Sequence, residues 1–340
     1  MTVTAIESVA ERVRAVVLGE GFGLCGVCPA EPSEHGAFFT DWLEAGKHGE
    51  MGYLSEHADK RLDVRRLIPE DEGGPARSVI VVADGYETSD IPAVDGEGRV
   101  ARYARGDDYH KVMKKRLHAA ADRLREMFPE HAFKACVDTA PIMEREHAAR
   151  AGLGWIGKNT LLIHPRHGSY MCLGALVTSM PLIDDAAGPP ALEPNRCGSC
   201  TRCIDACPTG CITPYSVDAS RCVSYLTIEH RSSIPADLQP MMGDALAGCD
   251  VCQEVCPWNA FDESGDGARA KYRVPMPVRP AYRPRVTSLD VAEVAEWGEE
   301  DRRETVRGSA LKRIKLPMWR RNATAVMHRK TTPGDEQENA

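Results

Sequence analysis

The chain has 340 residues, 43% hydrophobic and 27% charged, a composition typical of soluble globular proteins of about two domains. Taken alone, the formal net charge of −8 argues against a nucleic-acid partner. The sequence contains no run of about 18 apolar residues, so we expect no transmembrane helix. Residues 1–20 carry charges throughout and predict an amphipathic helix rather than a cleavable signal, so we expect a cytoplasmic protein without a membrane partner.

The first half of the sequence alternates helical and strand patterns, which predicts an α/β (α+β) domain over residues 1–183. The segment 78–84 is apolar and β-branched, as buried strands are. In chain order we predict a helix at 5–20, a strand at 78–84, an amphipathic helix at 108–128 that stops at Pro129, a strand beginning the segment 133–141, a helix at 144–152 and a strand at 171–179.

The second half begins with a linker rich in proline, alanine and glycine and then becomes rich in cysteine. We expect a ferredoxin-like domain over 184–285, which ends in a proline-rich crossover. Short helices from about residue 288 predict a basic, HEAT-like helical segment over 286–330, and residues 331–340 predict a disordered tail.

Thirteen cysteines are many for a reducing compartment, where clustered cysteines indicate metal or redox chemistry rather than disulfides. In short runs of this type three thiolates reach one cubane, and the fourth cysteine ligates the other cluster. A zinc site would use only four ligands and leave one run unexplained. We therefore predict two [4Fe–4S] clusters from two runs, Cys197, Cys200, Cys203 and Cys207 before Pro208, and Cys249, Cys252 and Cys256 before Pro257.

The two runs supply seven of the eight thiolates that two cubanes need. By the crossing rule, Cys256 completes the set begun by the first three cysteines of the first run, and Cys207 joins Cys249 and Cys252. Spacing leaves the eighth ligand open.

Cys211 and Cys222 are the nearest candidates for the eighth ligand. Cys211 follows Cys207 too closely for a standard loop, so we predict a buried thiol there. The remaining cysteines are weaker candidates, since they have no partner pair or lie in strand patterns that predict core positions: Cys25, Cys28, Cys136 and Cys172.

About 190 residues precede the cluster region, many more than a bare ferredoxin needs. The segment 102–110 combines phenols, charges and an imidazole, and Asp138 follows an apolar strand, where cofactors often gather. We expect desolvation to raise the pKa of Asp138, so that it could donate a proton. The alternative is a helix N-cap, because Asp-Thr-Ala-Pro can begin a helix.

The segment 302–330 holds ten Lys or Arg residues and one Glu, which leaves about −17 on the rest of the chain. One interpretation is a phosphate-binding surface, and the other is a solvated helix face.

Several segments together resemble the epoxyqueuosine reductases, the cobalamin-dependent enzymes of tRNA queuosine synthesis. The resemblance runs from about residue 8 to 325. Its motifs are VDTAPIMEREHAARAGLGWIGKNTLLIHPRHGS, CGSCTRCIDACPTGCI, RCVSYLTIEHR, GCDVCQEVCPWN, RYARGDDYH and GSALKRIKLPMWRRNA.

The resemblance implies the reduction of epoxyqueuosine to queuosine at the wobble position of tRNAs with a GUN anticodon, the last step of queuosine synthesis. It implies a monomer that uses base-off cobalamin, reduced to cob(I)alamin through two [4Fe–4S] clusters by a ferredoxin- or flavodoxin-type donor. Two other functions fit part of the pattern. A corrinoid reductive dehalogenase usually carries a twin-arginine signal, which we do not find, and a dicluster electron carrier leaves residues 1–190 unexplained.

The resemblance also implies residue roles. Asp138 would be the proton donor, Tyr103 an active-site phenol and Cys222 the eighth cluster ligand. Cobalamin would be held by Arg61, Asp138, Gly157, Lys158, Asn159, Thr160, Leu162 and Leu173. Contacts to tRNA phosphates would come from Arg313, Lys315, Arg320 and Arg321.

The sequence departs from the family in two places. It ends soon after GSALKRIKLPMWRRNATAV, so the longer C-terminal helical repeat of some relatives is not expected. Family members usually have another residue where Cys211 stands, which supports a spare thiol.

Overall fold

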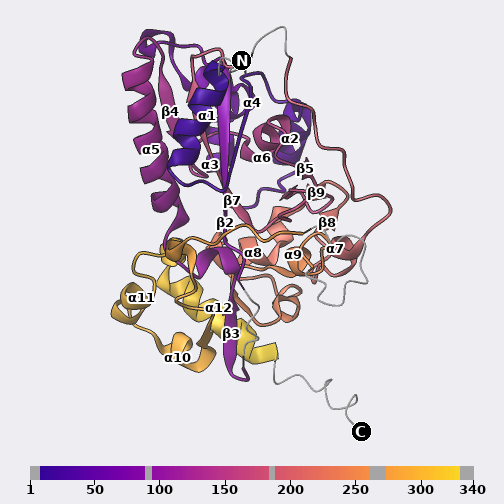
Figure 1. The fold of residues 1–340 in the computed structure, drawn as a ribbon. Coiled ribbons are helices and arrows are strands. Elements are labelled where there is room, and N and C mark those ends of the chain that lie inside the picture. Colours follow the sequence, from indigo (N-terminus) through magenta and orange to yellow (C-terminus); the bar gives the residue numbers. More distant parts are fainter. Residues whose placement is uncertain (1–7, 89–93, 184–187, 261–272, 330–340) are drawn as a thin grey trace.

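The structure is a computed structural model that describes residues 8–88, 94–183, 188–260 and 273–329. In Figure 1 the N-terminal α/β layers occupy the upper part, and the cluster region and the C-terminal helices lie below them. The mixed α/β architecture agrees with the predicted fold class. None of the helices in these ranges is long and apolar enough to cross a membrane.

A four-stranded sheet forms the centre of the N-terminal part. All neighbouring strands are antiparallel, and their order is β1 (Leu24–Pro29), β2 (Ser78–Gly85), β7 (Met171–Thr178) and β4 (Phe133–Cys136). Every position of β2 is buried, because this strand has a neighbour on each side and helices over both faces. The β-branched run predicted as a buried strand is therefore confirmed.

Helices cover the two faces of this sheet. Helices α1 (Val9–Gly19) and α5 (Tyr109–Met127) pack together on one face, and α6 (Glu144–Arg150) packs on the other. In α1, Ser8 and Glu11 form a reciprocal capping box, which fixes the start of the helix. Asp108 caps α5, and that helix ends before Pro129 as predicted.

The region after β4 decides between the two interpretations of Asp138, a proton donor or a helix N-cap, against the N-cap. Strand β4 ends at Cys136, and α6 begins only at Glu144, with Met143 at its N-cap. The interpretation of Asp138 as a helix N-cap is therefore wrong, and its carboxylate is available for another role.

Shorter elements complete the chain. Around the sheet lie α2 (Gly36–Glu44), α3 (Tyr53–Glu56), α4 (Ala58–Leu62), the 3₁₀ turn η3 (Arg102–Ala104), β5 (Trp155–Ile156) and β6 (Leu162–Ile163). The cluster region contains α7 (Arg202–Asp205), β8 (Ile212–Thr213), β9 (Ser216–Val217), α8 (Val223–Ile228), β10 (Ala245–Ala247) and α9 (Val251–Glu254). The C-terminal part contains β11 (Ser288–Asp290), α10 (Val291–Glu296), α11 (Glu299–Thr305), the 3₁₀ turn η8 (Ala310–Arg313) and α12 (Leu316–Arg329).

A second sheet links three stretches that are far apart in the sequence. Strand β3 (Glu97–Val100) pairs in parallel with β10 and antiparallel with β11. Below it, the fully buried Trp319 of α12 packs in one core with Leu246 and Val100. The predicted segments 1–183, 184–285 and 286–330 are thus joined through one sheet and one core. The predicted disordered tail, 331–340, lies outside the described residues.

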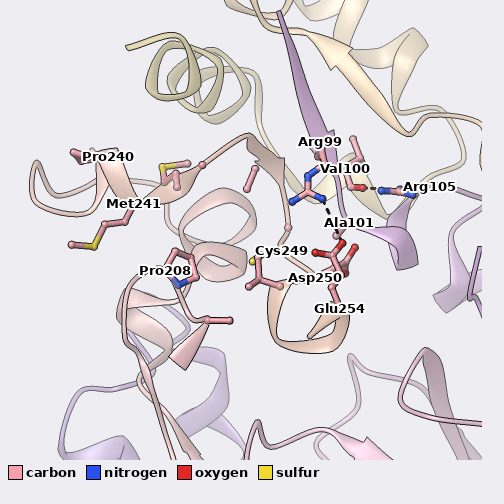
Figure 2. Close-up of a pocket in the computed structure, with 16 residues that line it drawn as sticks. Arg99, Val100, Ala101, Arg105, Pro208, Pro240, Met241, Cys249, Asp250 and Glu254 are labelled. Atoms are coloured by element: carbon pink, nitrogen blue, oxygen red, sulfur yellow. Dashed lines mark hydrogen bonds and ion pairs between the residues drawn. The ribbon is translucent and has the colours of Figure 1, made fainter. Parts of the chain in front are cut away.

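Figure 2 shows a cavity of about 320 Å³ beside this second sheet. It lies between β3, the separate segments around Pro208 and Met241, and the start of α9. Ion pairs of Arg99 with Asp244 and Glu254 close one wall. Cys249 reaches the cavity, so this space lies behind one of the cysteine groups described below.

Candidate active site

A much larger cavity, of about 1060 Å³, separates the N-terminal layers from the cluster region. Its volume is that of a site for a large organic ligand. One wall is aromatic and comes from α2, where Phe38, Phe39 and Trp42 face the cavity although no residue of this helix is fully buried. We did not predict this wall. The sequence signal for this wall is the cluster of aromatic residues at 38–42, because exposed apolar side chains on one helix need a partner or ligand to cover them.

The cysteines of the cluster region form two groups, as the crossing rule predicts. The first group lines a small cavity next to Trp258 and consists of Cys197, Cys200, Cys203 and Cys256. The second group lines the large cavity and consists of Cys207, Cys211, Cys222, Cys249 and Cys252. The thiols of Cys203 and Cys252, one from each group, are close enough to interact electrostatically. The second group therefore lies between the first group and the large cavity.

Both candidates for the eighth ligand belong to the second group. The Sγ atom of Cys211 lies 3.4 Å from that of Cys207, and its thiol also contacts Cys222. Cys211 is buried, as predicted, whereas Cys222 is partly exposed.

The four cysteines of the first half are buried in the sheet strands, as expected. Burial raises the pKa of Cys25, Cys28 and Cys136 to about 12, so these thiols are protonated at neutral pH.

The charge of Asp138 acts on two residues that line the large cavity, Tyr103 and Glu144, and Asp138 belongs to a chain of three polar side chains. Its Oδ2 is 2.9 Å from Nε2 of His110, and Nδ1 of the same ring is 2.8 Å from Oδ1 of Asp108. The backbone of Asp138 has φ +44°, a left-handed conformation that is costly for a residue with a Cβ. The side chain of Asp138 is 60% exposed, and that of His110 is 28% exposed.

The predicted pKa shift of Asp138 is wrong in sign. Desolvation acts to raise this pKa, but the hydrogen bond and positive charge of His110 outweigh it, and the pKa is lowered below its ordinary value. For His110 the desolvation penalty is likewise outweighed, here by Asp108 and Asp138, which raise its pKa to about 9. Burial alone predicts a raised pKa, and the neighbouring His110 imidazole reverses the sign.

Further titratable side chains surround this chain. Burial and the charge of Asp138 raise the pKa of Glu144 to about 8, and this carboxyl lines the large cavity. Tyr103 also lines the cavity, between the rings of Tyr86 and Tyr109, and burial raises its pKa. Among the described residues, Oε1 of Glu144 and Nε of Arg61 are buried polar atoms without a hydrogen-bond partner.

Five of the eight predicted cobalamin-binding residues divide into two sets. Arg61, Asn159 and Thr160 line the large cavity. Leu162 and Leu173 pack in the apolar core that contains β2 and β7.

The loop that contains Gly157 and Lys158 lies near the first cysteine group. The Lys158 ammonium donates to the carbonyls of Gly198 and Cys200, at 2.7 and 3.1 Å. A Cβ at Gly157 would lie 2.6 Å from Cδ1 of Ile163 and 2.8 Å from Oδ1 of Asn159, so a larger residue would require these two side chains to move.

Three of the four predicted tRNA contacts are engaged within the protein. Arg313 pairs with Glu229 and lies over the ring of Tyr53. Nε of Arg320 donates to the carbonyl of Trp297 at 2.8 Å, and Arg321 donates to carbonyls at 226, 230 and 232. Lys315 is exposed. These bonds favour the structural interpretation for Arg320 and Arg321.

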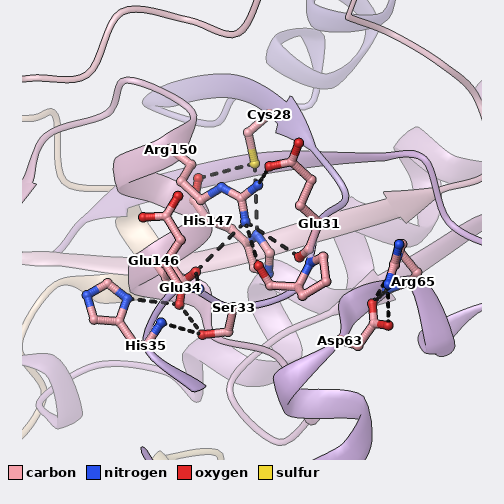
Figure 3. A network of polar contacts seen from close by, with 11 residues as sticks. Cys28, Glu31, Ser33, Glu34, His35, Asp63, Arg65, Glu146, His147 and Arg150 are labelled. Atoms are coloured by element: carbon pink, nitrogen blue, oxygen red, sulfur yellow. Dashed lines mark hydrogen bonds and ion pairs between the residues drawn. The ribbon is translucent and has the colours of Figure 1, made fainter. Parts of the chain in front are cut away.

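A buried polar network holds the loop 31–35 against α6, as Figure 3 shows. Glu146 accepts hydrogen bonds from the Ser33 hydroxyl, the Glu34 amide at 2.8 Å and Nδ1 of His35 at 3.1 Å. Burial alone would raise the pKa of Glu146, but these hydrogen bonds lower it to about 2. Arg150 adds an ion pair to Glu31. The network positions the rim of the large cavity, because His35 and Glu146 both line it.

Comparison with known proteins agrees with this arrangement. The sequence model of a family described as "4Fe-4S double cluster binding domain" matches residues 196–259, which contain both cysteine runs. A second family model, described as "Epoxyqueuosine reductase QueG, DUF1730", matches residues 61–139.

Curated relatives span most of the chain. The epoxyqueuosine reductase of Pseudomonas aeruginosa is 41% identical over 89% of this chain and 80% of its own length. That of Xanthomonas campestris pv. campestris is 38% identical over 96% of this chain and 88% of its own. A crystal structure of epoxyqueuosine reductase with an epoxyqueuosine-modified tRNA stem loop superposes with a TM-score of 0.78 at 26% identity, over 94% of this chain and 80% of the other. The chain belongs to the epoxyqueuosine reductase family of oxidoreductases.

Proposed function

We propose that this enzyme reduces epoxyqueuosine to queuosine at the wobble position of tRNA. The observation that carries the proposal is a cavity of about 1060 Å³ with cluster-type cysteines on one wall and the Asp138 chain beside another. The function of the curated relatives and the stem loop bound by a solved neighbour support this substrate. A tRNA substrate implies that the enzyme acts in the cytoplasm.

Two [4Fe–4S] clusters fit the two cysteine groups. We assign Cys197, Cys200, Cys203 and Cys256 to the first cluster and Cys207, Cys222, Cys249 and Cys252 to the second. The terminal ligands of a cubane point away from one another, so Cys207 and Cys211, in contact at 3.4 Å, are poor candidates for joint ligation. An acidic ferredoxin or flavodoxin would then deliver electrons to the first cluster, because the second borders the cavity.

Cobalamin fits the large cavity by size and by lining. The aromatic wall of α2 offers an apolar face for a corrin, and the unpartnered Arg61 Nε and Glu144 Oε1 offer polar contacts to its edge. Asn159 and Thr160 would hold the same ligand from the opposite loop. When bound, cobalamin supplies a strongly reducing cobalt centre next to the second cluster.

The residues of the chain supply position and protons. Conversion of an epoxide to an alkene consumes two electrons and two protons and releases the oxygen as water. Asp138 would protonate the oxygen as its C–O bond breaks, while Tyr103 bounds the same space. The exposed Lys315 would be nearest to the tRNA phosphates, since Arg313, Arg320 and Arg321 are engaged within the fold.

Anaerobic reconstitution tests this function. Protein reconstituted with iron, sulfide and cobalamin should convert epoxyqueuosine in tRNA to a nucleoside that has lost one oxygen, measured by mass spectrometry of the digested tRNA. Protein without cobalamin is the control and should leave the nucleoside unchanged. Equal conversion with and without cobalamin would contradict the proposed cofactor, and no conversion in either would contradict the substrate.

A further inference from the structure

The hydrogen-bond chain beside the cavity has too many acceptors for a neutral histidine. Both ring nitrogens of His110 face carboxylate oxygens, at 2.8 Å for Asp108 and 2.9 Å for Asp138. Ionised carboxylates only accept, and a neutral imidazole has one N–H. Both bonds are satisfied if the ring is an imidazolium, or if the ring is neutral and one carboxyl is protonated. The trio therefore carries one extra proton in either state.

We propose that Asp108, His110 and Asp138 form a proton relay, in which His110 stores the proton and Asp138 delivers it to the substrate oxygen. This inference rests on the proposed function for its acceptor. The two states of the trio differ only by movement of a proton along the 2.9 Å bond between Nε2 and Oδ2. Asp138 is the catalytic residue, and His110 and Asp108 are positioning residues that act through it.

The relay answers a difficulty in using Asp138 alone. The pKa of Asp138 lies below its ordinary value, so at neutral pH its carboxyl group is ionised and has no proton of its own to give. His110, with a pKa raised to about 9, is charged at that pH. Asp108, fixed as the cap of α5, holds the ring so that Nε2 faces Asp138.

One proton moves in each passage through the relay, and two passages supply the two protons that the reduction consumes. The Nε2–H bond of His110 breaks as the Oδ2–H bond of Asp138 forms, and the proton then passes to the substrate oxygen as the C–O bond breaks. The carboxylate is regenerated, and His110, 28% exposed, regains a proton from solvent. Asp108 stays ionised throughout, and its pKa is lowered below its ordinary value although desolvation opposes this.

The geometry of Asp138 suits delivery. Asp138 follows the end of β4 with a φ of +44°, and 60% of its side chain is accessible. The other titratable or charged groups that face the relay or its neighbours are Tyr53, Arg61, Tyr103, Tyr109, Lys111, Glu144, Arg145, Cys172 and Arg313. Among these Glu144 is the rival proton source, with its pKa raised to about 8 by burial.

A pH–rate comparison tests the relay. Wild-type turnover of epoxyqueuosine tRNA should fall as pH rises through about 9, the pKa of His110. His110→Gln keeps an N–H donor but cannot pass a proton, so its rate at pH 8 should fall by about 10²-fold or more. Asp108→Asn should keep the wild-type rate at low pH and shift the alkaline limb to lower pH. His118→Gln, exposed on the same helix, is the matched control.

Three results would overturn the relay. An alkaline limb unchanged in His110→Gln would remove His110 from proton delivery. A limb near pH 8 that moves only in Glu144→Gln would assign the proton to Glu144. A pH-independent loss in Asp108→Asn would mean that Asp108 only supports the fold.

A substrate-free measurement separates the relay from the proposed function. In protein with oxidised clusters, the His110 ring resonances should titrate near pH 9 by NMR and at lower pH in Asp108→Asn. If the wild-type protein failed to reduce the epoxide, the proposed function would be wrong, but this titration would still test the relay. An ordinary histidine titration would contradict it.

Discussion

Two histidine–carboxylate pairs lie beside the same cavity, and their burial is opposite. In the first pair Glu146 is 5% exposed and His35 is 51% exposed. In the second pair Asp138 is 60% exposed and His110 is 28% exposed. Glu146 has three hydrogen-bond donors, whereas Asp138 is bonded to His110 and Tyr109 and keeps more than half of its side chain accessible.

The difference separates a pair that holds the fold from a pair that can act on a ligand. A buried carboxylate with all its donors in place stabilises the charged form and has no surface to offer. An exposed carboxylate on a strained backbone costs stability, and such strain gathers at functional sites. Contact distances alone, 3.1 and 2.9 Å, would not distinguish the two pairs.

The largest effect that we expect comes from Asp138→Asn. The amide is nearly isosteric but has no acidic proton, so turnover should fall by about 10²–10⁴-fold while iron and cobalamin content stay unchanged. Asp122→Asn, an exposed surface change on α5, is the control. Wild-type turnover in Asp138→Asn would contradict a catalytic role for Asp138, and loss of cobalamin would make Asp138 a binding group.

Glu146→Gln should instead act on stability. The pKa of Glu146 is about 2 in the folded chain against an ordinary 4.5, so its contribution is fully present above pH 4.5 and is lost as pH falls through about 2. We expect the variant to lose about 2–3 kcal/mol of unfolding free energy at pH 7, measured by denaturant titration, with little change at pH 2. Glu130→Gln removes the exposed pair with His131 and should change little. An equal loss in both variants would contradict the structural role of the buried pair.

The same contrast between a supporting and an acting side chain applies to Cys211 and Cys222. Cys222→Ser should remove one cluster and about half of the iron. Cys211→Ser should keep both clusters, because the Cys211 thiol contacts those of both Cys207 and Cys222 and so is too close to either to ligate beside it. Iron analysis and the spectra of the reduced clusters measure this. Full iron in Cys222→Ser with loss in Cys211→Ser would reverse the assignment.

The smallest expected effect concerns the basic C-terminal segment. Charge reversal of the exposed Lys312 and Lys315 should weaken tRNA binding a few-fold and lower its salt dependence, because each phosphate contact releases counterions. Replacement of Arg320 and Arg321 by Gln should lower thermal stability instead, since their guanidinium groups bond to backbone carbonyls. Unchanged tRNA affinity in the lysine variant would leave only the family relationship as support for this surface.

Local patterns in the sequence determined the elements that depend on neighbouring residues. The buried strand at 78–84, the helix ending at Pro129 and the division of the cysteines into two groups were predicted, because burial runs, proline geometry and cluster spacing act over a few residues. The family motifs extended this to the reaction.

Only the tertiary structure decided which distant groups meet. His110 lies 28 residues from Asp138, and the sign of the Asp138 pKa shift depends on that contact rather than on burial. Arg321 reaches carbonyls about 90 residues away, which composition cannot reveal. The charge and hydrogen bonding of a side chain are set by what packs against it, and in this chain those partners come from elements that the sequence keeps far apart.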